Sequence, residues 1–449
     1  MESAISTGTH ELKGSMSNLH FDHEWQDPAG ARGDELRATW ASLSILIDGN
    51  PVTELQDEQT KSVRTRIFLP LFPLAEWLAD NWWFLRSEVS RSGVSMSREF
   101  DRRHNLRWAR EGFVLPSLRF VSLGDGVEAH WEAHGIADAG IRFLASGKAI
   151  LSGSAFFQAL DKFVSVVLTR LDETGLPQTT LHEQWRAIEE VEPDEQEYCE
   201  AAARLGRDPY AVDRQLETAI IDVSQRIRPE LLDDFLSLTN VKDLDADASA
   251  MAAASEAIAS DDDDIDALEA VRRQAPPFER GAKSWETGYR FATALRARLN
   301  AGDWQSRSLD ELAGHLRMDQ LDHCLLPAAG RCGFLDALIG CNQRRHPKFL
   351  IEKTRREEQR QFAFCRALFE HLTPPRDRFA VVSRLQTDRQ QMNRAFAAEF
   401  LAPHEMLKRD LSGAMVGEDE IDDLARDYGV STWVVRHQIE NHRLARVPV

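Results

Sequence analysis

Residues 388–401 read DRQQMNRAFAAEFL, and Ala402-Pro403 ends this run. A helix is predicted here, since proline cannot continue a helical hydrogen-bond ladder. A second helix is predicted upstream over residues 360–372, RQFAFCRALFEHL, and it ends before Pro374-Pro375. These two helices are the centre from which the organisation of the C-terminal portion can be worked out.

The flanking sequence adds a further helix and two short strands. Residues 285–300, WETGYRFATALRARLN, place Tyr289, Ala292, Leu295 and Leu299 on one stripe, which is typical of an amphipathic helix. Short apolar runs at 334–339 and 349–351 are consistent with strands. The C-terminal portion is therefore predicted to be mostly helical, with a small strand component.

Two segments carry a family resemblance. Phe396–Pro403 reads FAAEFLAP and Leu424–Ser431 reads LARDYGVS. Together they resemble the ImmA/IrrE-like metallopeptidases over residues 282–449. The resemblance implies a zincin-like domain, in which a helix bearing H-E-x-x-H is coupled to a downstream acidic ligand. It also implies a helix-turn-helix-like segment, here residues 420–444.

The residues expected to bind zinc are replaced. The resemblance puts Arg366, Ala367 and Glu370 at the places of the first His, the catalytic Glu and the second His, and Gln390 at the acidic ligand. A catalytic zinc needs three His or carboxylate ligands and an open position for water. No zinc or other cofactor is therefore expected, and the protein is predicted to be catalytically inactive. An active metallo-endopeptidase with displaced ligands is the alternative.

Polar side chains nevertheless remain at the degenerate site. Arg366 and Glu370 are four residues apart, so they are predicted to form an ion pair within one helix. A second hypothesis is that the old cleft binds a partner peptide or an anionic ligand through Arg366 and Arg394. Glu370 and His371 are the further candidates for such binding.

The helix-turn-helix-like segment raises the question of DNA binding. Ala425, Gly429 and Val435 have the small, turn-forming and buried character that lets two short helices cross. The second helix would carry residue types that read bases, namely Arg436, His437, Gln438, Asn441 and Arg443. Nearby acidic residues weaken a DNA anchor. Packing against the peptidase-like core is the preferred interpretation, and a DNA-binding regulator is the alternative.

The N-terminal portion, residues 34–240, is predicted to be a separate α+β domain. Residues 118–123, 127–134 and 141–150 alternate in polarity between glycine-containing turns, which favours a small antiparallel sheet. Helical patterns follow residue 153. A sequence of strands followed by helices is typical of the α+β class.

One polar and aromatic cluster in this domain is a candidate binding site. His104, Arg107, Trp108 and Arg110 lie close together before Gly112. If the protein is an enzyme of another kind, its chemistry is expected near this cluster.

Charge divides the chain into two portions. The whole chain has 54 Lys and Arg against 73 Asp and Glu, a formal net charge of −19. Residues 271–449 hold 29 basic and 24 acidic residues, a net of +5, which leaves −24 for residues 1–270. Residues 242–270 carry ten acidic residues and one Lys, so residues 241–272 are predicted to be an acidic linker or a marginal surface helix. Residues 1–33 are predicted to be a disordered leader, and 273–449 the ImmA/IrrE-like domain.

The remaining composition limits the class of protein. Five cysteines without a C-x-x-C pair indicate free thiols rather than a disulfide framework. The chain has no apolar run long enough to span a membrane and no secretory signal, so a cytoplasmic protein is expected. The resemblance implies a regulatory or sensor component of a bacterial stress or phage-defence system, acting by binding, most simply to a protein partner.

Overall fold

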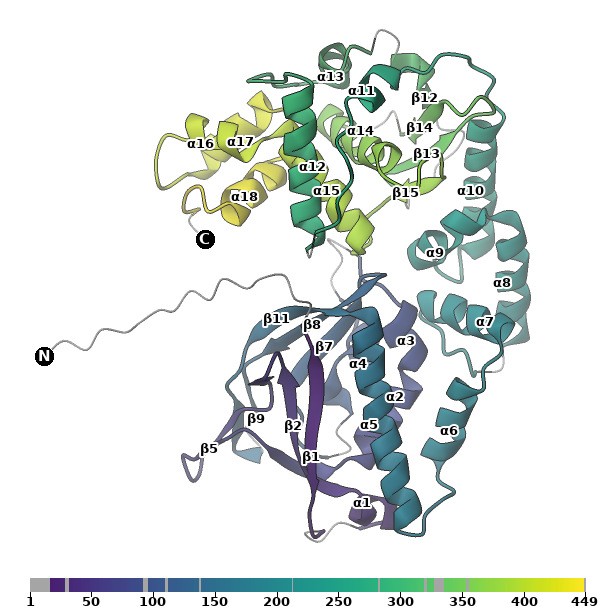
Figure 1. The fold of residues 1–449 in the computed structure, drawn as a ribbon, viewed down its shortest axis with the longest axis vertical. Helices are drawn as coiled ribbons and strands as arrows, with labels where there is room; N and C mark the ends of the chain where they lie inside the picture. The colour runs from purple at the N-terminus through teal and green to yellow at the C-terminus, as the bar shows by residue number, and fades with distance from the viewer. Residues whose placement is uncertain are drawn as a thin grey trace, which may run out of the picture. The chain divides into compact units, whose positions relative to one another are not determined.

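The computed structural model describes residues 17–28, 32–91, 96–109, 112–136, 139–211, 213–281, 283–318, 321–326, 335–352 and 355–447. The fold is α+β, as predicted: antiparallel sheets are followed by a mostly helical C-terminal region (Figure 1). The chain forms two compact units. Unit 1 contains Met1–Trp82, Asp101–Val121 and Asp125–Glu190, and unit 2 contains Trp83–Phe100, Ser122–Gly124 and Val191–Val449.

The strands before α5 form three small sheets. In the first, β1 and β6 both run antiparallel to β2, which also pairs with β3. The other two sheets have the orders β5-β4-β10-β9 and β11-β8-β7. The strands are β1 Leu19–Trp25, β2 Trp40–Ile47, β3 Asn50–Pro51, β4 Leu55–Asp57, β5 Val63–Arg64, β6 Ile67–Pro70, β7 Ser117–Ser122, β8 Gly126–Glu132, β9 His134–Ile136, β10 Ile141–Phe143 and β11 Gly147–Ser152.

The long helix α5 packs on strands β1, β8 and β11. It buries an apolar stripe that includes Phe156, Leu160 and Val167, and its first turn is capped by the Ser152 hydroxyl. Trp82 and Trp185 contact each other edge to face within the core. The helices of this region are α1 Asp34–Ala38, α2 Phe72–Asp80, α3 Trp82–Ser87, α4 Arg98–His104, α5 Gly153–Glu173 and α6 Thr180–Glu189.

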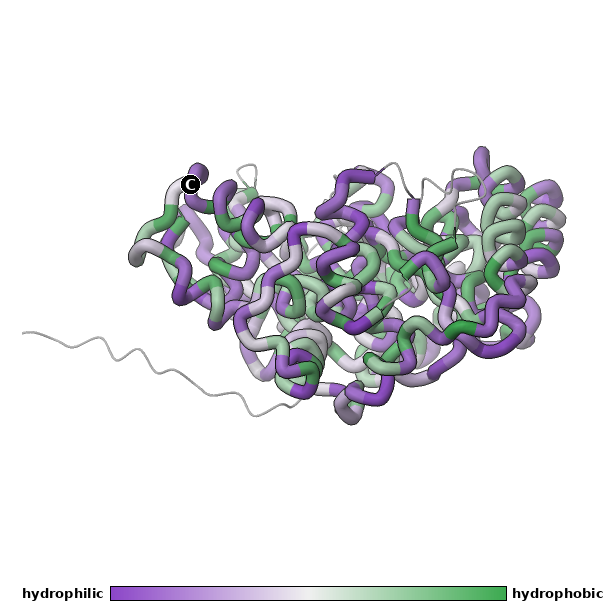
Figure 2. Tube along the Cα trace, turned by 90° about the horizontal axis from the view of Figure 1, so that it is seen from above, coloured by the Kyte–Doolittle hydropathy of each residue, from purple (hydrophilic) through white to green (hydrophobic). Residues whose placement is uncertain are grey.

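Unit 2 begins its long continuous segment with four helices that have one buried face each. They are α7 Pro193–Arg204, α8 Arg214–Arg226, α9 Pro229–Leu238 and α10 Leu244–Ala259. Figure 2 colours the chain by hydropathy, and purple hydrophilic stretches alternate there with green hydrophobic ones along the helical parts of the trace. This alternation is expected of amphipathic helices that cover a core.

Helix α10 corrects the expectation of an acidic linker or a marginal surface helix: the segment is helical, but the helix has a buried apolar face. It contacts β13 and β14, and its buried residues Leu244, Met251 and Ile258 belong to the same apolar cluster as Leu338 and Leu350 of those strands. The acidic residues occupy its solvent side, so composition alone concealed the apolar stripe. The last division between the compact units along the chain falls between residues 190 and 191, and none falls within 241–272.

A four-stranded sheet with the order β12-β14-β13-β15 supports the helices of the candidate site. β13 runs antiparallel to β14 and β15, whereas β12 is parallel to β14. The elements are α11 Glu269–Arg273, α12 Ser284–Arg298, α13 Leu309–His315, β12 Leu325–Leu326, β13 Ala337–Cys341, β14 Pro347–Ile351, α14 Glu357–Leu372, β15 Ala380–Val382 and α15 Asp388–Leu401.

Helices α12 and α15 approach each other closely. A Cβ added at Gly288 of α12 would lie 2.2 Å from the Met392 carbonyl oxygen and 2.8 Å from the Phe396 amide nitrogen of α15. Only glycine fits such a contact. This approach fixes the position of the FAAEFLAP segment in the core.

The last three helices are α16 His404–Asp410, α17 Glu418–Asp427 and α18 Thr432–Asn441. Val435 and Ile439 of α18 and Ala425 of α17 are buried in the cluster that contains Phe396 and Phe400. The helix-turn-helix-like segment therefore packs on its own core.

The expectation of a leader over residues 1–33 is also corrected. Strand β1 lies within that range and pairs with β2 along its whole length, from Leu19 opposite Ile47 to Trp25 opposite Ala41. The alternation of large residues with His and Asp in this strand was too short to stand out from its polar surroundings. Residues 1–16 and 29–31 of the expected leader lie outside the described residues.

Candidate functional site

The position that the resemblance assigns to the first zinc ligand lies on α14, facing α15. Arg366 is buried and donates four hydrogen bonds. Its Nε reaches Asn393 Oδ1 at 2.8 Å and its Nη1 reaches Asp336 Oδ2 at 3.0 Å. Its Nη2 reaches Gln390 Oε1 at 2.7 Å and the Ser383 carbonyl oxygen at 2.6 Å. The guanidinium group therefore occupies the space between the two helices and satisfies its charge there.

Glu370 lies one turn further along α14 and has other partners. Its carboxylate accepts hydrogen bonds from Arg378 and Asn393, both at 2.7 Å. Arg389 forms an ion pair with the same carboxylate at 3.2 Å. Two arginine cations thus neutralise a side chain that is buried.

The predicted Arg366–Glu370 ion pair does not form. Arg366 finds its carboxylate partner in Asp336, which lies just before β13, and Glu370 finds Arg378 and Arg389. The i,i+4 spacing predicted the wrong ion pair, because the partner of a buried charge depends on which groups tertiary packing brings next to it.

Gln390 stands where the resemblance places the acidic ligand. Its Oε1 accepts from Arg366 and from the Ser383 amide, and its Nε2 donates to the Val381 carbonyl at 2.7 Å. Ala367 is fully buried. Every polar group at this position is committed to a hydrogen bond, and the described residues here offer neither a metal-binding cage nor an unneutralised carboxylate to act as a base.

His371 is separated from this network. Its side chain is buried and its ring lies against Phe349, with 6.4 Å between the ring centroids. Burial lowers the pKa of His371 to about 4. It therefore contributes a neutral imidazole to the core and is not brought together with Arg366.

A cavity of about 330 Å³ opens beside the network. Four arginines line it, with two carboxylates among the other lining groups: Asp336, Arg355, Glu358, Gln359, Phe362, Ala363, Arg366, Arg384, Arg394, Ser431, Trp433 and Val434. Four cations against two anions give the lining a surplus of positive charge. The cavity can receive an anionic group.

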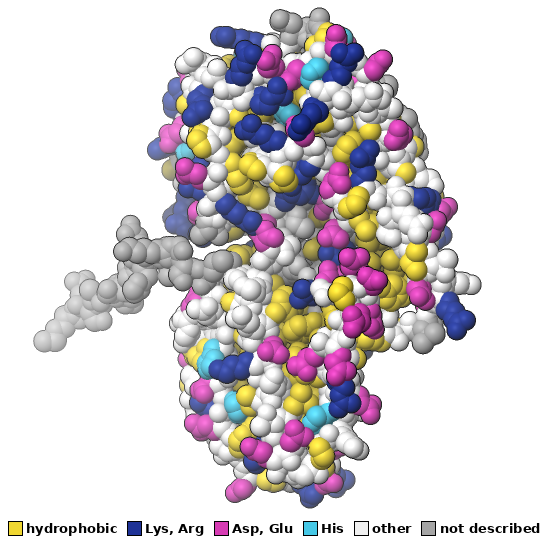
Figure 3. All heavy atoms as spheres, turned by 45° about the vertical axis from the view of Figure 1, so that its right-hand side comes forward, with side chains coloured by type: hydrophobic (Ala, Val, Ile, Leu, Met, Phe, Trp, Pro, Cys, Tyr) yellow, Lys and Arg dark blue, Asp and Glu magenta, His cyan; other side chains and the backbone are white. Residues whose placement is uncertain are grey.

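The surplus charge lies on Arg394 and Arg384. Arg394 donates to the Leu385 carbonyl at 2.9 Å and, more weakly, to the Ser383 carbonyl at 3.4 Å, so its charge is not neutralised by a carboxylate in direct contact. Burial and the nearby Arg366 lower the pKa of Arg394 to about 9, which still leaves it charged at neutral pH. Arg384 is exposed. Figure 3 shows Lys and Arg side chains gathering on the upper part of the face drawn there, over unit 2.

The candidate DNA-reading residues have mixed environments. Arg436 forms an ion pair with Glu418, and Asn441 donates to the Tyr289 hydroxyl at 3.2 Å. His437 bonds the Trp433 carbonyl of its own helix, and Arg443 is exposed. The prediction that Gln438 reads a base is wrong. Gln438 is buried and donates to Glu399 and to the Ala402 carbonyl, so it is not available to a base.

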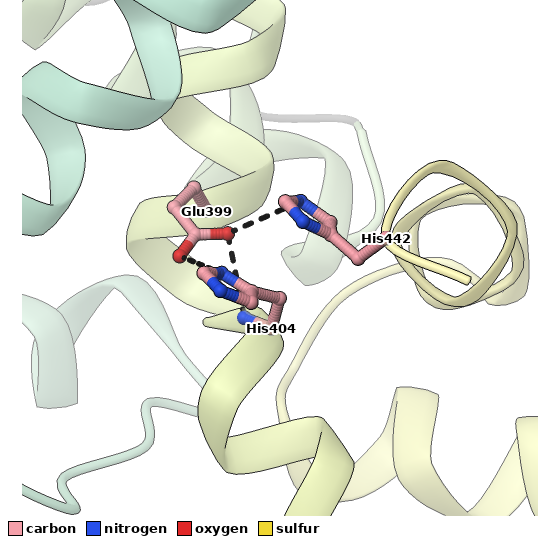
Figure 4. A group of neighbouring side chains, drawn as sticks. All are labelled: Glu399, His404 and His442. Carbon is pink, nitrogen blue, oxygen red and sulfur yellow. Dashed lines mark hydrogen bonds and ion pairs between the residues drawn. The ribbon is translucent and has the colours of Figure 1, made fainter. Parts of the chain in front are cut away.

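The sequence did not predict a second cluster, made by Glu399, His404 and His442. One ligand atom from each of the three lies within 4.8 Å of those from the other two (Figure 4). Glu399 belongs to FAAEFLAP and His404 follows it directly. The five-residue spacing of Glu399 and His404 was a visible signal, but nothing in the sequence places His442 beside them.

The N-terminal candidates are organised around Asp101. Arg107 and Arg119 form ion pairs with its carboxylate, and the Trp108 indole donates to it at 2.8 Å. Burial alone would raise the pKa of Asp101, but these hydrogen bonds and one from Asn105 lower it to about 2. The cluster therefore has the partners of a structural network. His104 is buried beside the Phe120 carbonyl at 2.8 Å, and Arg110 lies outside the described residues.

Comparison with known proteins finds a partial similarity to a ferrochelatase. No family model and no solved structure matches the chain. A stretch of 131 residues is 28% identical to a ferrochelatase of Idiomarina loihiensis (strain ATCC BAA-735 / DSM 15497 / L2-TR), covering 25% of this chain and 31% of that protein. The chain thus spans about a third of the length of this relative. No helix in the described ranges has the length and apolar character needed to cross a membrane.

Proposed function

We propose that this protein is a catalytically inactive ImmA/IrrE-like pseudo-metallopeptidase that acts by binding. In this proposal it is a cytoplasmic regulatory or sensor component of a bacterial stress or phage-defence system. Its binding site is the arginine-lined cavity beside α14, and its ligand is an anionic group carried by a protein partner.

The buried environment of Arg366 is the observation that carries the proposal. A guanidinium with four hydrogen bonds stands at the position that the resemblance assigns to the first zinc-binding His. A divalent cation would have to displace it or lie against it, at a large electrostatic cost in a buried site. Replacement of a single zinc ligand would not by itself supply a buried guanidinium whose hydrogen bonds are all made.

The cavity supports the binding half of the proposal. Arg384 and Arg394 supply positive charge to the cavity, and Arg394 has no carboxylate in direct contact. Trp433 adds an exposed aromatic face. Arginine forks suit carboxylate and phosphate groups, and aromatic residues serve as anchors at interfaces.

Metal content and peptidase activity test the inactive site. Full-length protein, purified without a metal-binding tag, is expected to show no cleavage of an unstructured protein such as casein, with or without added zinc. Zinc binding that is lost in Glu370→Ala or His371→Ala, together with cleavage that these variants lack, would support the active peptidase instead.

A charge-reversal pair tests the cavity. A fluorescent octaglutamate peptide serves as the probe, at low and at physiological salt. Arg384→Glu is expected to weaken its binding by about tenfold or more, because it reverses a cation at the cavity mouth. Arg356→Glu makes the same change in net charge at a side chain that is 79% exposed and outside the cavity lining. Equal affinity of the two variants would refute the cavity as the binding site.

A further inference from the structure

The cluster of Glu399, His404 and His442 joins three helices. Glu399 lies near the end of α15, His404 is the first residue of α16, and His442 follows α18 (Figure 4). Glu399 Oε1 lies 2.7 Å from His404 Nδ1, and Glu399 Oε2 lies 3.8 Å from His442 Nε2. The three side chains meet where the helix-turn-helix-like segment packs on the core.

The carboxylate in this cluster is almost completely buried. Its hydrogen-bond donors are His404 and Gln438, with distances of 2.7 and 2.9 Å. Burial raises the pKa of Glu399, although the electrostatic interaction with His404 and the hydrogen bonds from His404 and Gln438 act in the opposite direction. Arg296, a nearby cation, donates instead to the Phe400 carbonyl and other groups. The arginine therefore does not contact the carboxylate, whose direct side-chain partners are His404 and Gln438.

The His442 imidazole has an unsatisfied nitrogen in the same place. Its Nε2 is buried and has no hydrogen-bond partner. If this nitrogen carries the proton, its acceptor at 3.8 Å is too distant for a hydrogen bond. If it does not, a lone pair faces a carboxylate oxygen. A cation between the two groups would satisfy both.

We propose that Glu399, His404 and His442 bind one divalent transition-metal ion, with zinc as the ion that this ligand set fits best. Two imidazoles and one carboxylate form a ligand set that zinc accepts, and imidazole also suits copper and nickel. The ion would fasten α16 and α18 to α15. This site is independent of the degenerate position on α14, and it revises the expectation that the chain binds no metal.

Features around the cluster match those of metal sites. Gln438 lies on α18, one turn before His442, and donates hydrogen bonds to Glu399 and to the Ala402 carbonyl, both at 2.9 Å. Outer partners of metal ligands orient the ligands in this way. The His404 and His442 side chains remain 28% and 19% exposed, so the cluster lies close to the protein surface. Glu405 lies 3.3 Å from His404 Nε2 on the solvent side.

Metal binding requires a defined rearrangement. The two imidazole rings are stacked, with centroids 4.2 Å apart and planes 5° apart. Tetrahedral zinc ligands lie about 3.4 Å from one another, given zinc–ligand bonds of about 2.1 Å. The hydrogen bond between His404 and Glu399 therefore opens, its proton passes to solvent, and the rings turn so that their lone pairs converge on the ion.

Zinc titration of tag-free, metal-stripped full-length protein tests the proposal. Calorimetry against a chelator of known affinity, together with the visible absorption of added cobalt, measures stoichiometry and geometry. One ion per chain is expected, with a higher melting temperature when zinc is present. His404→Ala and His442→Ala are each expected to weaken zinc binding at least about tenfold. Loss of an outer partner already lowers metal affinity by about that factor, and loss of a ligand should lower it at least as much.

His437→Ala is the matched control, because this histidine lies on α18, five residues before His442, and its contacts among the described residues are the carbonyl and the ring of Trp433. It is expected to keep wild-type zinc affinity. Circular dichroism checks that each variant is folded, and Glu399→Gln provides a further variant that keeps the hydrogen-bonding shape. Absence of saturable binding, or equal affinity in all variants, would overturn the proposal. Loss of zinc in Glu370→Ala alone would count against the inactive site on α14 instead.

Discussion

At the scale of single residues, Arg366 is a buried cation whose four hydrogen bonds should contribute to stability. Replacing it by methionine removes the cation while keeping much of the side-chain volume. Asp336 keeps Arg355 as a partner, but Asn393, Gln390 and the Ser383 carbonyl lose a donor. Arg366→Met is expected to lower the free energy of unfolding by about 3 kcal/mol or more.

Urea denaturation followed by tryptophan fluorescence measures this change. Arg356→Met is the control, since its side chain is largely exposed at the start of α14, and its effect is expected within about 0.5 kcal/mol. Similar stability of the two variants would show that the Arg366 network contributes little.

His371 makes stability depend on pH. Its pKa is about 4 in the folded chain, because burial disfavours the charged ring, and about 6.5 when unfolded. The unfolded state therefore gains its proton first as the pH falls. The stabilisation is complete above about pH 6.5 and is lost progressively toward pH 4, by up to about 3 kcal/mol.

Denaturation of wild type and His371→Gln at pH 7.5, 6 and 5 measures this contribution. The variant is expected to lose less stability than wild type between pH 7.5 and 5, because glutamine does not titrate. Parallel curves for the two proteins would contradict the buried neutral imidazole.

At the scale of elements, Gly429 sets the crossing of α17 and α18. Its φ is +59°, and a Cβ there would lie 2.2 Å from the Ser306 carbonyl oxygen. Both the left-handed backbone and the contact exclude a side chain. Gly429→Ala is expected to lower the free energy of unfolding by about 2 kcal/mol or more.

Gly413→Ala is the control for this change. An added Cβ at Gly413 meets no atom within 4 Å, and its φ is outside the left-handed region. Thermal unfolding by circular dichroism compares the two variants. A small, equal effect in both would refute the close approach at Gly429.

At the scale of the whole molecule, the limits of unit 2 determine which fragments can fold. Residues 273–449 alone lack α10, whose buried face covers Leu338, Leu350 and Val381 of the sheet. The fragment is expected to expose this apolar face and to associate or unfold. Size-exclusion chromatography and near-ultraviolet circular dichroism of the fragment and the full chain measure this outcome. A monomeric fragment with a native near-ultraviolet signal would support the prediction that the acidic segment is a linker.

The sequence by itself determined the elements whose patterns are local. The helices over 360–372 and 388–401 and the strands near 334–339 and 349–351 correspond to α14, α15, β13 and β14. Helical periodicity, proline stops and short apolar runs depend on neighbouring residues, so they could be read directly. The α+β class followed from the order of the N-terminal portion, in which alternating segments precede helical patterns. Four of the five cysteines lie in the described residues and are free thiols, as predicted.

The partners of the buried charges depend on how distant segments pack together. The pairing of Arg366 with Asp336 joins residues 30 positions apart, and Glu399 meets His442 across 43 positions of sequence. The apolar stripe of α10 was likewise hidden by acidic composition until the sheet that it covers was in place. Periodicity reports which face of an element is apolar, whereas the partner of a buried polar group depends on which distant segments packing brings together.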